Sequence, residues 1–90
     1  MMWEAFPGGD LVRKGIDDLA AGRVTAHALL VSIGAPRLRQ LGVAVPHPLD
    51  EADHRLWELL AEDGADSAHG RYNALVRRLV SFERALACAA

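Results

Sequence analysis

The stretch from Ala28 to Ile33 constrains the fold most, because its residues are apolar on every side of a helix and only Ser32 interrupts them. A helix that is apolar all round must be covered on all sides in a globular protein. Thr25 is well suited to cap this helix at its start. The sequence therefore predicts a central, buried helix beginning at Thr25, around which the rest of the chain packs.

A turn is expected directly after this helix. Pro36 disfavours helical geometry at the residue before it, so the central helix is predicted to end near Gly34. Pro36 is then well placed to begin a short helix over 36–41, which Gly42 would end. The segment VAVPHPL at 43–49 is expected to be an extended connector, because its two prolines block regular structure.

Apolar residues recur at helical spacing in three further segments, which are expected to be helices: 10–21, 50–63 and 66–88. Asp10 and Asp50 are the predicted caps of the first two, and Gly22 and Gly64 are expected to end them. The inner face of the segment 50–63 is predicted to consist of Leu56, Trp57, Leu59 and Leu60. The last helix has the clearest apolar face, formed by Tyr72, Leu75, Val76, Leu79, Phe82 and Leu86.

These elements predict an all-α fold, a small helical bundle of four main helices with a short extra helix after Pro36. Residues 10–90 are expected to form one domain. Residues 1–9 contain a proline and two adjacent glycines, which predict an irregular N-terminal arm. The arm carries Trp3 and Phe6, which we expect either to fold back onto the core or to dock on a second subunit.

Composition and charge bear on the class of protein. The net charge of −2 argues against a nucleic-acid-binding domain, which is usually basic. A hydrophobic share of 51% is generous for ninety residues, so part of it is expected to cover a partner, most simply in a homodimer. A single cysteine, Cys88, leaves no disulfide within the chain, and no signal peptide or membrane-spanning run is recognised, so a cytoplasmic location is expected.

Two alternatives concern the centre and the end of the chain. Residues 25–45 have the outline of a helix-turn-helix, in which Arg37 and Arg39 would contact nucleic acid. Glu83 projects inside the apolar arc of the last helix, so it is expected to form a buried ion pair with Arg13, Arg23, Arg55 or His27. Alternatively, Glu83 and Tyr72 would line a cleft for a small ligand, together with Asn73 and His69.

No catalytic motif is found, and neither a cofactor nor a metal site is predicted. Asp50, His54 and Glu58 line one face of the third helix, which is expected to be a solvated charged face rather than a metal site. The sequence predicts a non-enzymatic protein-interaction or assembly module that binds a protein partner or itself. Its candidate interface combines aromatic residues of the arm with polar residues of the last helix: Trp3, Phe6, Arg71, Tyr72, Asn73 and Arg78.

Overall fold

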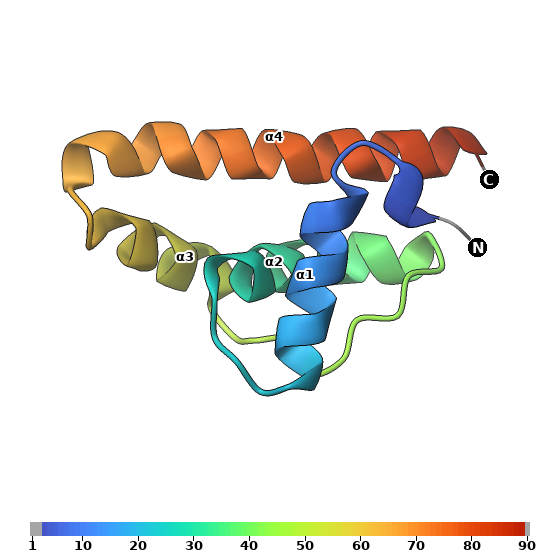
Figure 1. The fold of residues 1–90 in the computed structure, drawn as a ribbon, viewed down its shortest axis with the longest axis horizontal. Helices are drawn as coiled ribbons and strands as arrows, with labels where there is room; N and C mark the ends of the chain where they lie inside the picture. The colour runs from blue at the N-terminus through green and yellow to red at the C-terminus, as the bar shows by residue number, and fades with distance from the viewer. Residues whose placement is uncertain (1–2, 90) are drawn as a thin grey trace.

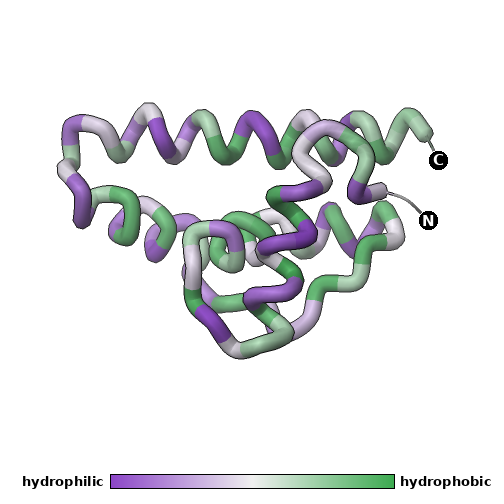
Figure 2. The backbone as a smooth tube through the Cα atoms, in the orientation of Figure 1, coloured by the Kyte–Doolittle hydropathy of each residue, from purple (hydrophilic) through white to green (hydrophobic). Residues whose placement is uncertain are grey.

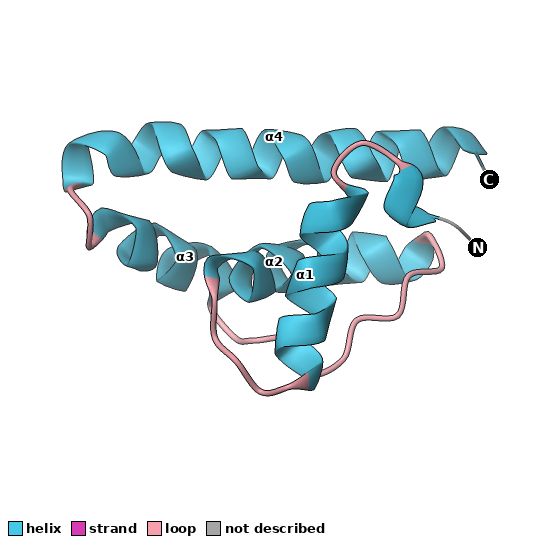
Figure 3. Cartoon of the chain, in the orientation of Figure 1, coloured by secondary structure: helices cyan, strands magenta, loops and turns pink. Residues whose placement is uncertain are grey.

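The computed structural model describes residues 3–89 and confirms the all-α fold. Four helices follow one another along the chain: α1 (Gly9–Ala20), α2 (Ala26–Gln40), α3 (Ala52–Ala61) and α4 (Ala65–Ala89). A short 3-10 helix, η1 (Trp3–Ala5), precedes them, and loops join the helices without any strand in the described range (Figures 1 and 3). Met1 and Met2, which belong to the predicted arm, lie outside the described residues.

α2 lies at the centre, because α1, α3 and α4 each pack against it. Its residues Ala28, Leu29, Leu30 and Val31 are at most 1% exposed, which confirms the predicted buried helix. Thr25 is its N-cap, as expected, and the side-chain oxygen of Thr25 accepts a hydrogen bond from the backbone N–H of Ala28. The apolar segment that most constrained the fold is thus its buried centre.

The predicted break in this helix is wrong. α2 continues through Pro36 to Gln40, so there is neither a turn at Gly34 nor a separate helix over 36–41. A proline inside a helix removes one backbone hydrogen bond and crowds the preceding turn. The helix persists because Ala35 and Leu38, on either side of the proline, are 2% and 0% exposed. Their burial in the core offsets the local cost of the proline.

α1 packs closely on α2 through Gly15. A Cβ atom at this position would lie 2.4 Å from Cγ2 of Val31 and 2.5 Å from the carbonyl oxygen of His27, so only glycine fits. The expected helix end at Gly22 is confirmed by its left-handed φ of 77°. Asp10 is not the N-cap of α1, because Gly8 occupies that position and Asp10 lies in the first turn.

α3 is shorter than predicted, and two expectations about it are wrong. Its N-cap is Glu51, in a left-handed conformation, rather than Asp50. Leu56 and Leu60 are buried, but Trp57 is 39% exposed instead of facing the core. The aromatic ring falls at the edge of the short apolar arc, where the neighbouring helices do not cover it.

The connector over 43–49 contains neither helix nor strand, as expected. Two side chains of α2 hold it in place. The hydroxyl of Ser32 accepts a hydrogen bond from the backbone N–H of Leu49 at 2.9 Å, and Nη2 of Arg39 donates to the carbonyl oxygen of Val45 at 2.9 Å. The one polar residue in the central apolar stretch therefore fixes the path of the connector.

α4 extends along the whole molecule (Figure 1). Its 25 residues span about 37 Å at the usual helical rise, close to the longest dimension of 39 Å. Only Ala68, Leu79, Phe82 and Leu86 of this helix are buried, and apolar and polar residues alternate along it (Figure 2). α4 is therefore a covering helix with one side against the core.

The N-terminal residues fold back onto this long helix. Trp3 and Phe6 are half-buried against the core. This agrees with the expectation that the arm folds back onto the core. The ring of Trp3 meets Phe82 edge-on at a centroid separation of 5.5 Å, and the guanidinium of Arg13 lies 4.7 Å from the centre of the same ring. The beginning of the described chain is thus in contact with α4.

Candidate interaction surface

A fully buried carboxylate, Asp18, forms the densest polar cluster of the described residues. It accepts hydrogen bonds from the ammonium of Lys14 at 2.7 and 2.8 Å, from Nε of Arg23 at 3.0 Å and from the hydroxyl of Thr25 at 2.6 Å. The hydrogen bond from Lys14, followed by that from Thr25, holds the pKa of Asp18 well below its usual range, although burial opposes the shift. The cluster joins α1 to the cap of α2 and is complete within itself.

Helical periodicity gave little warning of this cluster. Lys14 and Asp18 are four residues apart, a spacing that supports a helix only weakly, and Asp18 falls beside the apolar arc of α1 rather than within it. Its burial comes from the loop between the helices, which folds back so that the backbone N–H of Arg23 donates to the carbonyl oxygen of Asp18 at 2.8 Å. The residues that follow α1, and not the helix alone, therefore enclose the carboxylate.

Glu83 is half-buried where α4 crosses α2. Its Oε2 would lie 3.2 Å from a Cβ placed on Gly34, so the carboxylate sits directly against the backbone of α2. Burial raises the pKa of Glu83, and the positive charge of Arg37 opposes this shift. Among residues 3–89, no basic side chain lies within 4 Å of the Glu83 carboxylate, the distance that defines an ion pair. The predicted ion pair with Arg13, Arg23, Arg55 or His27 is therefore wrong.

The proposed ligand cleft is not assembled around Tyr72. Tyr72 and Glu83 share one side of α4 but stand eleven residues apart, about 16 Å along the helix axis. Asn73 is engaged with His69 one turn earlier, at 3.1 Å. These four residues therefore form two separate places on α4 rather than one.

Arg37 and Arg39 are exposed near the end of α2, but they do not begin a second helix. The helix-turn-helix outline at 25–45 is therefore wrong, because one continuous helix occupies 26–40. Arg39 is also occupied by its hydrogen bond to the connector. Arg39 holds the connector, and the positive charge of Arg37 acts on Glu83 of α4.

Arg71 and Arg78, by contrast, come together at one groove. The groove lies between α2, α3 and α4, has a volume of about 390 Å³, and is lined by Ala26, His27, Leu60, Arg71, Ala74, Leu75 and Arg78. Its floor is apolar. Nη1 of Arg71 lies 3.2 Å from the carboxylate of Asp63, and Nη2 of Arg78 lies 3.2 Å from that of Asp10. The sequence predicted these two arginines as interface residues, but it did not predict the apolar residues that line the groove between them.

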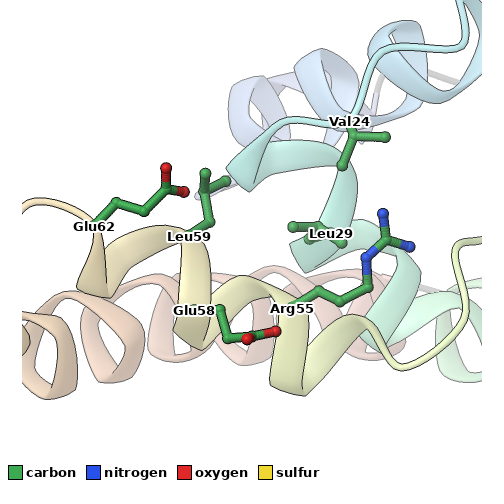
Figure 4. Close-up of a pocket in the computed structure, with 6 residues that line it drawn as sticks. All are labelled: Val24, Leu29, Arg55, Glu58, Leu59 and Glu62. Atoms are coloured by element: carbon green, nitrogen blue, oxygen red, sulfur yellow. The ribbon is translucent and has the colours of Figure 1, made fainter.

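A second pocket, of about 420 Å³, opens between the beginning of α2 and α3 (Figure 4). Leu29 and Leu59 give it apolar walls, and Val24, which is 52% exposed, lies at its edge. Its charged groups are mixed in sign, since Arg55 is accompanied by Glu58 and Glu62. This pocket therefore presents no single charge to a ligand.

The charged face of α3 lies in solvent. Nε2 of His54 and Oε1 of Glu58 are 3.3 Å apart, and both side chains are largely exposed. Within residues 3–89, no three His, Cys, Asp or Glu side chains are grouped so that they could hold a metal ion. Over the same range, no helix has the length and apolar character required to span a membrane.

Comparison with known proteins adds no relative. No protein-family model matches the chain, and no curated protein or solved structure shows significant similarity to it. The surface itself therefore has to support any functional proposal.

Proposed function

We propose that this chain is a helical protein-interaction module that self-associates through α3 and α4. The observation that carries the proposal is the exposure of Trp57, a large aromatic residue left 39% exposed on α3. Tryptophan is enriched among the residues that contribute most to protein interfaces. Exposed apolar residues mark such contact sites where they belong to a larger apolar patch.

The neighbouring helix supports the same surface. α3 packs against α4, and the apolar residues Tyr72 and Val76 of α4 are only half-buried. Four of the 25 residues of α4 are buried by the chain itself. A partner that covered part of the remainder would add to the small core that a chain of this length can form.

The charges of the two helices are suited to a second copy of this chain. The exposed residues of α3 include Asp53 and Glu58, whereas those of α4 include Arg77 and Arg84. In a two-fold dimer each patch contacts the other patch of its partner. An acidic helix facing a basic helix is then favourable twice, once on each side of the axis. A cytoplasmic homodimer is the form of the protein that we propose.

Sedimentation equilibrium of the full chain tests this proposal. We expect a monomer–dimer equilibrium at micromolar concentration, and we expect Trp57→Ala to weaken dimerisation by about thirtyfold, which corresponds to about 2 kcal/mol for an interface residue of this kind. Val24→Ala is the matched control, because Val24 is also an exposed apolar residue but lies before α2. A strict monomer at high micromolar concentration, or equal effects of the two substitutions, would overturn the proposal.

A further inference from the structure

We infer that the groove between α2, α3 and α4 binds an acidic amphipathic helix of a partner protein, with two carboxylates placed two helical turns apart around an apolar side chain. This groove is the one lined by Ala26, His27, Leu60, Arg71, Ala74, Leu75 and Arg78. The inference does not rest on self-association, which the exposed Trp57 supports independently.

The floor of the groove suits an apolar side chain. Leu60 of α3 and Leu75 of α4 contribute branched aliphatic groups, and Ala26 and Ala74 leave room between them. Ala74 is exposed, so no side chain of this molecule fills the space above it. An apolar residue entering here would remove surface from water on both partners, which favours association.

The arginines at the two ends set the charge and the spacing. Arg71 and Arg78 are seven residues apart on one helix, so their Cα atoms are separated by about 10.5 Å along the axis. Carboxylates seven residues apart on a bound helix have the same spacing. Ala74 and Leu75 lie between the two arginines, which places the apolar contact between the two charged ones.

Each guanidinium already binds a carboxylate within this molecule. Arg71 holds the carboxylate of Asp63, and Arg78 holds that of Asp10, each at 3.2 Å. The two aspartate side chains are 76% and 80% exposed, and ion pairs in such positions contribute little to stability. A partner's carboxylates can therefore replace them without a large loss, and burial beside the apolar floor strengthens the new pairs.

The experiment uses two labelled helical peptides of fifteen residues and measures fluorescence anisotropy with the full chain at low and moderate salt. Both peptides carry the same leucines on one face. One has Glu at two flanking positions seven residues apart, and the other has Gln there. We expect the Glu peptide to bind at least tenfold more tightly, a difference that shrinks as salt screens the charges.

Substitutions assign the binding to the groove. The double variant Arg71→Gln, Arg78→Gln should remove the preference for Glu. Arg37→Gln should preserve it, because Arg37 is exposed near the far end of α2 and does not line the groove. Ala74→Glu places a repelling charge in the groove and should abolish binding of the Glu peptide. Ser81→Glu is its matched control, because Ser81 is exposed two turns further along the same side of α4 but does not line the groove. Circular dichroism checks that each variant is folded.

Three results would overturn the inference: no binding by the folded protein, equal binding of the two peptides, or equal effects of the groove variants and their controls. A dimer that dissociates in the Arg71, Arg78 double variant would show that a second copy occupies the groove, which also contradicts a partner segment. If the peptide binds in this way to a protein that remains monomeric, the groove is supported and the proposed self-association fails.

Discussion

Asp18 shows how one buried carboxylate can join two helices. Three side-chain donors surround it, from α1, from the loop and from the cap of α2. The same hydroxyl of Thr25 that donates to Asp18 accepts the capping hydrogen bond from Ala28. The start of the central helix is therefore tied to the charge state of a residue seven positions earlier.

Replacing Asp18 with Asn should lower the urea midpoint of unfolding at neutral pH, because Lys14 and Arg23 lose their shared carboxylate. The pKa of Asp18 is lowered in the folded state, so its contribution is complete above the ordinary value of about 3.9 and is lost as the pH falls further. The difference between the wild type and the variant should therefore shrink below about pH 4. Asp17→Asn, at an exposed neighbouring position, is the control and should change the midpoint little.

Glu83 should have the opposite effect on stability. Because its pKa is raised in the folded state, the ionised carboxylate is a cost that appears as the pH rises through the ordinary value of about 4.3 and beyond. Glu83→Gln should raise the urea midpoint at pH 7, and this gain should disappear below about pH 4. Arg37→Gln removes the opposing positive charge and should lower the midpoint at pH 7. A stabilising effect of Arg37→Gln would contradict this assignment.

At the scale of elements, the contact between α1 and α2 depends on a single missing side chain. Gly15→Ala should destabilise the protein by about 1–3 kcal/mol, because the added methyl group meets the backbone of α2 and cannot be accommodated by a rotamer change. Gly70→Ala is the matched helical control, since a Cβ atom there meets nothing within 4 Å. It should stabilise the protein by about 0.5–1 kcal/mol. Chemical denaturation measures both, and equal signs would refute the close contact.

The helices themselves were largely predictable from the sequence, whereas their boundaries were less so. Periodic apolar residues located all four segments, and Thr25 and Gly22 marked true ends. Asp10 and Asp50 failed as caps because the chain enters α1 and α3 through left-handed residues just beside them. Pro36 failed as a breaker because burial on both sides of it outweighs a local preference. The tendency of proline to end a helix was therefore outweighed by the packing of the residues around it in the core.

The candidate surface was less predictable than the helices. Arg71 and Arg78 stood out in the sequence, but Leu60 and Ala26, which complete their groove, come from other helices and carry no special pattern. The exposure of Trp57 was not predicted. Its position at the edge of the apolar arc of a short helix is compatible with a buried or an exposed side chain. Surfaces formed by several elements require knowledge of how those elements pack.

At the scale of the whole molecule, Phe82 joins the N-terminal residues to the core. It is fully buried, and Trp3 packs against its ring. Phe82→Ala should reduce the free energy of unfolding by about 3–5 kcal/mol, a large share of the total for a small domain. Tryptophan fluorescence and helical circular dichroism should still change together during unfolding. Separate transitions would show that the N-terminal contact is not part of the cooperative unit, and Ser81→Ala provides an exposed control.

The contact between Trp3 and Phe82 also orders events during protein synthesis. Trp3 is made long before its packing partner Phe82, whereas α1 and α2 can pair as soon as both are made. Until then Trp3 remains available to water, chaperones and proteases. Folding is therefore completed only when the last turns of α4 are made. In a nascent chain stalled before Phe82, Trp3 should remain unpacked.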